Sequence, residues 1–193
     1  MGDYKAYSDQ QLVAECLKNN RQAQHELYLR FSFMMNGVCL RYAANQAEAE
    51  DILQDSFIKA FKNLDKYSGQ GALGGWLRKI TVNTALEQYR KNKSLKNLTV
   101  LVDVSEAQIE INDSAIENLE LEDLLTKIQR LPKGFRTVFN LYAVEGYTHK
   151  EIGELLGISA GTSKSQYSRA RIILRQMIQN ELAEEHKNLN YAK

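Results

Sequence analysis

Residues 147–175, YTHKEIGELLGISAGTSKSQYSRARIILR, decide how this sequence is expected to fold. Thr148 and Glu151 have the spacing of a capping box, which starts a helix, and Gly157 supplies the left-handed residue that ends it. Ser159 then offers a side-chain cap for a second helix after a very short turn. The stretch therefore predicts a helix-turn-helix.

The second of these helices divides its side chains between two faces. One face holds the residues expected to pack inward, namely Ser163, Tyr167, Ala170, Leu174 and Met177. The other gathers short hydroxyls and long cations, namely Lys164, Ser165, Ser168 and Arg169. Such side chains suit the base edges and phosphates of a DNA major groove. The pattern favours DNA binding, and a plain helical hairpin with a solvated basic face is the alternative.

Composition predicts an all-α protein. The chain has 193 residues, 44% of them hydrophobic, and a single proline, which is enough core for one large or two small helical domains. No apolar run approaches the ~20 residues of a membrane helix, and residues 1–10 carry no hydrophobic signal region. We therefore expect a cytoplasmic protein with no direct membrane insertion.

The residue types that carry catalysis and metal binding are scattered. Cys16 and Cys39 occupy separate apolar helical positions, which predicts buried, reduced thiols. The histidines, His25, His149 and His186, suggest neither ligands nor a catalytic base. The sequence also lacks a phosphate-binding glycine loop ending in Lys-Ser/Thr and any catalytic triad. It predicts no enzyme, no metal, no cofactor and no small-molecule substrate.

The net charge of +1 conceals an uneven distribution. Residues 1–93 hold 13 Lys and Arg against 10 Asp and Glu, residues 94–126 hold 1 against 8, and residues 127–193 hold 11 against 6. The three parts carry +3, −7 and +5. Two basic units flanking an acidic connector give two surfaces compatible with nucleic acid.

Domain boundaries follow from the loss of helical periodicity. We predict a flexible acidic linker over residues 94–113, which show no sustained period. Ser114 with Glu117 is a further capping box, so a second, four-helix domain is expected over residues 114–180. Residues 1–93 form the first domain, and residues 181–193 a polar C-terminal tail.

The first domain is predicted to be a bundle of helices. Ser8 with Gln11 and Asn45 with Glu48 mark two helix starts, and residues 23–42 form a long amphipathic helix between them. On the helix that Asn45 caps, Asp51, Gln54 and Asp55 make a compact acidic and amide face. Taken by itself, such a face is usually a solvated surface.

A glycine-rich loop is expected between Lys66 and Trp76. Gly69, Gly71, Gly74 and Gly75 leave it little stiffness, and the basic helix that follows carries Arg78, Lys79, Asn83, Arg90, Lys91 and Lys93. An adaptable loop between Tyr67 and Trp76 can hold an unstacked base, because aromatic stacking and phosphate attraction both act on single strands. The residues alone favour the simpler interpretation, a hairpin loop with a buried Trp.

The chain resembles the extracytoplasmic-function (ECF) group of bacterial sigma factors, the promoter-recognition subunits of RNA polymerase in the sigma-70 family. The resemblance covers nearly the whole chain. It is carried by AEDILQDSF at residues 49–57, Trp76-Leu77 with Ile80 and Asn83, Leu131-Pro132, Gly146-Tyr147, Glu151-Ile152, Gly161-Thr162, Ser165 and Arg169-Ala170-Arg171. It implies two helical domains, an N-terminal one like sigma region 2 and a C-terminal helix-turn-helix like sigma region 4.

The resemblance also implies partners and roles. Asp51, Gln54 and Asp55 would dock on the coiled coil of the largest subunit of core RNA polymerase. The loop of residues 66–76 would pocket a nontemplate base of the minus-ten element, whose contacts would be Tyr67, Trp76, Lys79, Asn83 and Arg90. The minus-thirty-five element would meet Thr162, Lys164, Ser165, Ser168, Arg169 and Arg171, with Arg171 and Arg175 on the backbone. The linker would run toward the polymerase channels, and an anti-sigma factor is an expected partner.

Four residues depart from the family pattern, so its promoter preference is not transferred. Leu73 replaces a frequent Phe, Asp55 a commoner Glu, Ser163 a frequent Val and Gln166 a frequent Arg. Two other functional classes compete with a sigma factor. One is an autonomous helix-turn-helix regulator whose first domain dimerises or senses a signal, and the other is a protein-interaction adaptor that never touches DNA.

Overall fold

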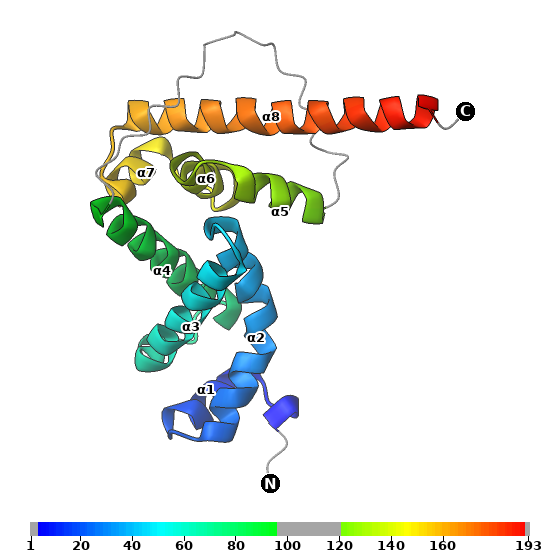
Figure 1. Cartoon of the computed structure of the whole chain (residues 1–193). Helices are drawn as coiled ribbons and strands as arrows, with labels where there is room; N and C mark the ends of the chain where they lie inside the picture. Colours follow the sequence, from blue (N-terminus) through cyan, green and yellow to red (C-terminus); the bar gives the residue numbers. More distant parts are fainter. Residues whose placement is uncertain (1–3, 96–120, 192–193) are drawn as a thin grey trace. The chain divides into compact units, whose positions relative to one another are not determined.

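The computed structural model describes residues 4–95 and 121–191, and all regular structure in these residues is helical. The chain divides into two compact units, Met1–Lys93 and Ser94–Lys193. The all-α prediction is therefore confirmed (Figure 1). The predicted linker, residues 94–113, lies outside the described residues except for its first two positions, which close a helix. The predicted cap formed by Ser114 and Glu117 lies outside them too.

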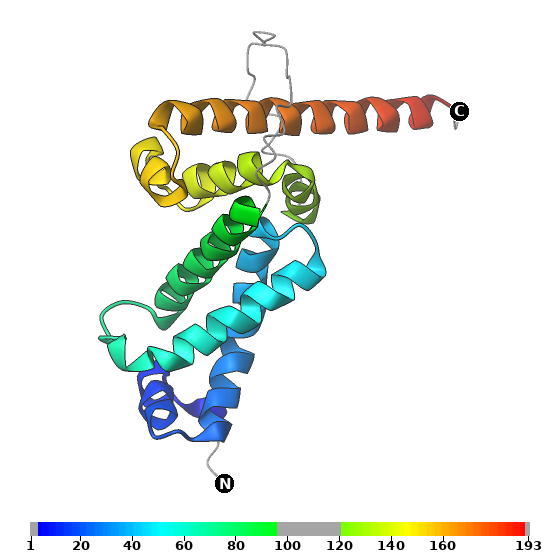
Figure 2. The same ribbon diagram turned by 60° about the vertical axis from the view of Figure 1, so that its left-hand side comes forward.

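The first unit consists of four α-helices and two short 3-10 turns. In chain order they are η1 (Tyr4–Ala6), α1 (Asp9–Leu17), α2 (Arg21–Tyr42), α3 (Gln46–Lys62), η2 (Leu64–Lys66) and α4 (Leu73–Leu95). Figure 1 shows α4 crossing α3, and Figure 2 shows the same helices from a second side. The predicted start at Ser8 is confirmed by a full capping box with Gln11. The Asn45 side chain likewise accepts the Glu48 N–H at 2.9 Å.

Helices α1 to α4 enclose a single apolar interior. Its most buried members include Leu12, Cys16, Leu27, Met35, Cys39, Ile52, Phe57, Leu77, Val82 and Leu86. The helical spacing of α2 predicts that Phe31, Met34, Met35 and Tyr42 belong to this core, and all but Met34 are buried. Met34 is 50% exposed, and Phe33, which lies outside that spacing, is 90% exposed.

The glycine-rich loop is shorter than predicted. Helix α4 already begins at Leu73, so Gly74 and Gly75 lie in its first turn and not in the loop. The reason is tertiary: Leu73 is 1% exposed, and a Cβ on Gly74 would lie 3.0 Å from Met34 Cε. Burial of this turn against α2 outweighs the weak helix propensity of glycine.

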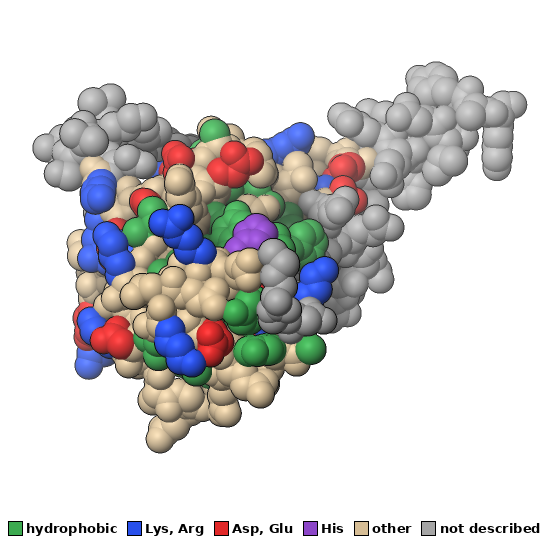
Figure 3. Space-filling model, turned by 90° about the horizontal axis from the view of Figure 1, so that it is seen from below, with side chains coloured by type: hydrophobic (Ala, Val, Ile, Leu, Met, Phe, Trp, Pro, Cys, Tyr) green, Lys and Arg blue, Asp and Glu red, His purple; other side chains and the backbone are tan. Residues whose placement is uncertain are grey.

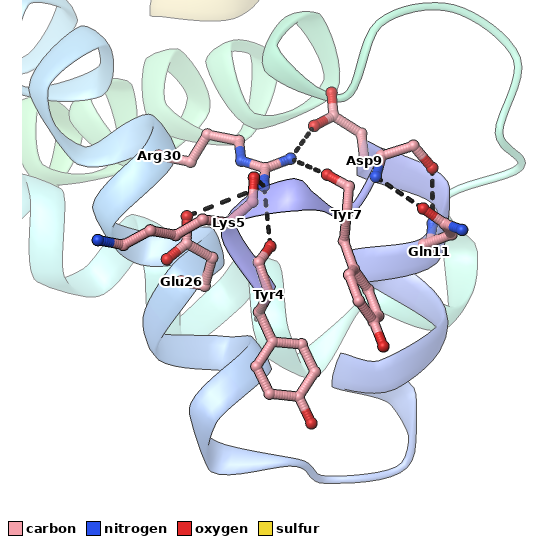
Figure 4. Close-up of polar contacts among 8 residues, drawn as sticks. Tyr4, Lys5, Tyr7, Asp9, Gln11, Glu26 and Arg30 are labelled. Atoms are coloured by element: carbon pink, nitrogen blue, oxygen red, sulfur yellow. Dashed lines mark hydrogen bonds and ion pairs between the residues drawn. The ribbon is translucent and has the colours of Figure 1, made fainter. Parts of the chain in front are cut away.

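Arg30 of α2 holds the N-terminal segment in place (Figure 4). Its Nη1 donates to the carbonyl of Tyr7 and to Asp9 Oδ1, both at 2.9 Å. Its Nη2 donates to the carbonyls of Tyr4 at 3.3 Å and Lys5 at 3.4 Å. A planar guanidinium with several donors suits such a cluster of acceptors. Together these bonds fasten η1 and the start of α1 to α2.

The second unit is organised around its last helix. Among its described residues, 121–191, the elements are α5 (Leu121–Arg130), α6 (Lys133–Phe139), the π-helical segment η4 (Asn140–Val144), α7 (His149–Leu156) and α8 (Ala160–Tyr191). Helices α5, α6 and α7 all pack against α8. A cluster formed by Ile128, Leu131, Ala170 and Leu174 lies at the centre. The residues predicted to form a polar tail, 181–193, are helical within α8 as far as Tyr191.

Helix α6 continues directly into a π-helical segment. Lys133–Phe139 is α-helical and Asn140–Val144 is π-helical, with the Glu145 N–H donating to the Asn140 carbonyl at 3.0 Å. Gly146 ends it at φ +77, a backbone conformation that favours glycine. The wider π turn carries Tyr142, which faces α7 through its contact with His149.

Candidate nucleic-acid interface

The helix-turn-helix has the local geometry that its sequence predicts. Thr148 Oγ1 accepts the Glu151 N–H at 3.3 Å, and Glu151 Oε2 accepts the Thr148 N–H at 2.8 Å. Hydrogen bonds from the Thr148 hydroxyl and N–H lower the pKa of Glu151. Gly157 ends α7 at φ +64, and Ser159 Oγ accepts the Thr162 N–H at 2.9 Å to cap α8. All of these signals are local, which is why the sequence could specify them.

Helix α8 buries one face and exposes the other, as predicted. Ser163 and Ala170 are 0% exposed and Leu174 is 2% exposed, whereas Tyr167 and Met177 of the predicted inward face are half-buried. The exposed residues of the predicted reading face are Thr162, Lys164, Ser165 and Ser168, and Arg169 beside them is half-buried. Arg171 lies at the edge of the buried face, with its guanidinium carbon 5.9 Å from the centre of the Tyr167 ring. The exposed set presents hydroxyls and a cation along the first turns of the helix.

An aromatic group that the sequence did not suggest lies beside these turns. The rings of Tyr142 and His149 are stacked, with centroids 4.2 Å apart and an interplanar angle of 8°. Tyr167 packs on Tyr142 with its centroid 4.5 Å away. His149 Nδ1 is 3.0 Å from the hydroxyl of the buried Ser163. Burial, and then the charge of Lys164, lower the pKa of His149.

In the first unit, a hollow of about 250 Å³ opens between the end of α3, η2 and α4. It is lined by Lys59, Asn63, Lys66, Trp76, Ile80, Asn83, Thr84 and Glu87. Trp76 and Ile80 offer apolar surface and Asn83 offers an amide, whereas the Asn63 amide is bonded to the Lys59 carbonyl and to Lys66. This combination can stack a flat aromatic ring and hydrogen-bond its edge.

Polar contacts hold the wall of the hollow, and those of Lys59 cross long sequence separations. Lys59 Nζ lies 2.6 Å from Glu87 Oε2 and donates to Thr84 Oγ1 at 3.3 Å. Lys66 Nζ donates to Asn63 Oδ1 at 2.7 Å. The hollow therefore has cations at its rim, but both are engaged with neighbouring side chains.

The predicted minus-ten residues divide between the hollow and its surroundings. Trp76 and Asn83 line it, and the Tyr67 ring lies 5.6 Å from that of Trp76. The Tyr67 hydroxyl donates to the Gly71 carbonyl at 2.8 Å, which closes the loop on itself. Lys79 and Arg90 are exposed on α4 outside the lining.

Sequence reasoning missed the part of this hollow that α3 and η2 contribute. Lys59, Asn63 and Lys66 stand well before Trp76 in the chain, and only tertiary packing brings them to α4. The available signal was the basic end of α3, where Lys59 and Lys62 fall in the last turn.

A second, wider groove lies between α2 and α3. It measures about 720 Å³ and is lined by Tyr28, Asn36, Gln46, Glu50, Leu53, Gln54, Phe57, Ile58 and Phe61. Of the predicted polymerase contacts, Gln54 lines the groove, whereas Asp51 and Asp55 are exposed on α3 outside the lining. Ile58 is 44% exposed here. Figure 3 shows one face of the molecule on which hydrophobic side chains reach the surface among charged ones.

Both cysteines lie in the interior of the first unit. Cys16 and Cys39 are free and buried, as predicted, and burial raises their thiol pKa values to about 11 and about 12. The described ranges contain no grouping of His, Cys, Asp and Glu suited to a metal ion. None of the helices in those ranges combines the length and the apolar character needed to cross a membrane.

Comparison with known proteins gives a consistent result for both units. Residues 27–95 match sigma-70 region 2, and residues 121–174 match sigma-70 region 4. The sigma factor RpoE of Bartonella quintana, solved in complex with the anti-sigma factor NepR, aligns with 80% of this chain and 96% of its own. That alignment has 23% identity and a TM-score of 0.47.

Curated relatives match over most of their length. The ECF RNA polymerase sigma factor SigW of Bacillus subtilis is 33% identical over 154 residues, which are 74% of this chain and 82% of that protein. The ECF RNA polymerase sigma-E factor of Escherichia coli is 30% identical over 175 residues, 85% of this chain and 91% of that one. The RNA polymerase sigma-H factor of Pseudomonas aeruginosa is 28% identical over 187 residues, covering 91% and 96%. The chain thus belongs to the ECF sigma factors of the sigma-70 family and directs transcription initiation.

Proposed function

We propose that this sigma factor divides promoter recognition between its two units: the second reads duplex DNA at the minus-thirty-five element, and the first captures an unpaired base of the minus-ten element. The observation that carries the proposal is the contrast between the exposed hydroxyl and cation face of α8 and the Trp76-lined hollow of the first unit.

At the minus-thirty-five element, α8 enters the major groove with its first turns. Lys164 and Arg169 have the length and charge to reach guanine edges, and Ser165 and Ser168 can bond to either base type. Thr162 near the helix start and Arg171 at the edge of the buried face contact phosphates. Exposure of Lys164, Ser165 and Ser168 supports this assignment.

At the minus-ten element, a flipped base enters the hollow and stacks on Trp76, with Tyr67 supporting that ring. The amide of Asn83 bonds the edge of the base and so helps to select it, while Lys79 and Arg90 hold the strand backbone. Opening a duplex costs a few kcal/mol per base, which stacking in a preformed hollow offsets. The size and lining of the hollow support this role.

Core RNA polymerase binds the α2–α3 side of the first unit through Asp51, Gln54 and Asp55. The groove beside Gln54 contains Leu53, Phe57 and Ile58, so a helix of the polymerase can bury apolar side chains there. The sigma factor itself performs no chemistry, because polymerase makes the RNA. We place transcription initiation by this protein in the cytoplasm. The two domains span residues 1–93 and 114–180, and the acidic linker spans residues 94–113. An anti-sigma factor is a further partner.

The deciding experiment is binding to core polymerase followed by transcription. Purified chain should bind core enzyme and start transcripts at discrete sites in a genomic DNA library. Gln54→Arg should lose binding by about tenfold or more, because it places a cation between Asp51 and Asp55 on the face proposed to contact polymerase. Gln10→Ala, an exposed change on α1, is the matched control. Site-specific duplex binding without polymerase would instead indicate the autonomous regulator. Binding of neither polymerase nor DNA would indicate the adaptor.

A further inference from the structure

His149 is the point at which three elements of the second unit meet. It is the first residue of α7, its ring stacks on Tyr142 of η4, and its Nδ1 lies 3.0 Å from Ser163 Oγ of α8. The ring of Tyr167, one turn further along α8, has its centroid 5.9 Å away. Ser163 is 0% exposed, so its hydroxyl has exchanged water for this partner.

The residues proposed to read DNA lie on the exposed side of the first turns of α8. The contacts of His149 hold the buried side of the same turns in place. Ser163 directly precedes Lys164, and Tyr167 directly precedes Ser168. A rotation of α8 that moved Lys164 or Ser168 relative to DNA would break the contact between His149 and Ser163 or disturb the ring group. A small error in the placement of a reading helix is enough to lose a bidentate base contact.

We propose that His149 is a positioning residue for the reading face of α8, and that its protonation tightens binding to the minus-thirty-five duplex. The inference rests on the proposed function of α8. It concerns a residue that makes no base contact of its own and acts through Ser163 and through its charge.

The contact with Ser163 is compatible with both protonation states. A hydroxyl both donates and accepts, so it can face a neutral Nδ1 or a protonated one. Protonation therefore adds a positive charge beside the first turn of α8 without removing the hydrogen bond. The position of α8 is kept, and the charge next to the DNA changes.

The surroundings of the ring determine the sign of the effect. Titratable and charged side chains on the surrounding elements are Tyr142 on η4, Glu145 directly after it, Lys150, Glu151 and Glu154 on α7, and Lys164, Tyr167, Arg169 and Arg171 within residues 160–171 of α8. Glu151 already accepts hydrogen bonds from Thr148. In the free protein, burial and Lys164 keep the pKa of His149 below its usual value, so the ring is neutral at pH 7.

DNA phosphates beside α8 change this balance. Their negative charge offsets that of Lys164 and favours the protonated ring, so DNA binding raises the pKa of His149. Linkage then requires the reverse effect, in which protonation raises DNA affinity. Affinity should increase as the pH falls through the interval between the lower pKa of the free protein and the higher pKa of the complex.

The test measures holoenzyme affinity for a promoter duplex between pH 8 and pH 6 at fixed ionic strength. The probe is a labelled fragment selected by transcription from a genomic library. His149→Gln keeps a planar side chain that can form hydrogen bonds, but it cannot titrate. His149→Phe keeps a ring for stacking, but it can neither titrate nor form a hydrogen bond with Ser163. As the pH falls between these values, we expect wild-type affinity to rise severalfold relative to that of His149→Gln. Thermal unfolding confirms that each variant is folded.

Two results would overturn the inference. Equal pH dependence of wild type and His149→Gln would reject the protonation effect, and unchanged affinity of His149→Phe at pH 8 would reject the positioning role. Arg169→Ala, measured on the same fragment, separates this inference from the function on which it rests. If Arg169→Ala leaves affinity unchanged, the reading face itself is wrongly assigned. If Arg169→Ala weakens binding while the pH profiles coincide, only the role of His149 fails.

Discussion

The two surfaces that we propose to bind nucleic acid have opposite shapes. The first unit offers a hollow of about 250 Å³ whose wall includes Trp76 and Asn83, whereas the second unit offers the convex first turns of α8 with Lys164, Ser165 and Ser168 exposed. A hollow of this kind suits a base that has left its stack, since a paired base cannot enter it. A convex helix suits the major groove of an intact duplex. The shape of each surface thus indicates which state of DNA it meets.

The largest effect is expected where the hollow loses its stacking surface. Trp76→Ala should reduce promoter opening by about 5- to 150-fold, since base–aromatic stacking is worth ~1–3 kcal/mol. Trp76→Phe, which keeps a ring, should recover most of the activity. Chemical probing of unpaired thymines measures opening directly. Equal opening by wild type and Trp76→Ala would remove the distinction between the two surfaces.

Changes on the exposed face of α8 should affect duplex binding and not promoter opening. Lys164→Ala or Arg169→Ala should each weaken duplex binding at the minus-thirty-five element by ~1–3 kcal/mol where the side chain makes a bidentate base contact. Opening of a template that lacks this element should be unaffected. Footprinting on both templates measures the separation. Loss of opening on the second template would show that α8 is not confined to duplex reading.

The role of the turn between α7 and α8 can be tested by measuring the free energy of unfolding. Gly157→Ala places a side chain at φ +64 and should destabilise the second unit by ~1–2 kcal/mol. Gly161→Ala is the matched control, because Gly161 lies in the first turn of α8 without a positive φ, and alanine there should be neutral or mildly stabilising. Chemical denaturation of the full chain gives both values. Equal effects would mean that the left-handed residue does not control the turn.

The smallest expected effect concerns base choice within the hollow. Asn83→Ala should change the preferred base of the minus-ten element while weakening opening by only ~0.5–1.5 kcal/mol, the usual net value of one hydrogen bond. Gln88→Ala, on a different face of α4, should leave the preference unchanged. Transcription from a promoter pool randomised at the minus-ten element measures the base preference of both variants. An unaltered preference in Asn83→Ala would leave base selection to other lining residues.

Local signals made much of the fold predictable. The caps at Ser8, Asn45 and Thr148 and the left-handed Gly157 are all confirmed, because each depends on residues within one turn of chain. The exposed face of α8 follows from the same periodicity. The family resemblance of the two halves then supplied the order of the domains.

Contacts between distant residues were not predictable in this way. The Lys59–Glu87 pair joins residues 28 apart in sequence, and the His149–Ser163 pair joins residues 14 apart, so no local spacing reveals either. The premature start of α4 at Leu73 has the same origin, since burial against α2 decided it. Trp76 and Asn83 could therefore be predicted from the sequence, whereas Lys59, Asn63 and Lys66 on the other side of the hollow could not.

The Arg30 cluster has a consequence for how freely the beginning of the chain can vary among related proteins. Three of its acceptors are main-chain carbonyls, those of Tyr4, Lys5 and Tyr7. Every amino acid carries such a carbonyl, so these bonds tolerate drift in the side chains at all three positions. The guanidinium has no such freedom, since a lysine cannot reproduce its fork of donors. Substitutions at Tyr4, Lys5 or Tyr7 should therefore preserve these hydrogen bonds, whereas substitution of Arg30 should remove them.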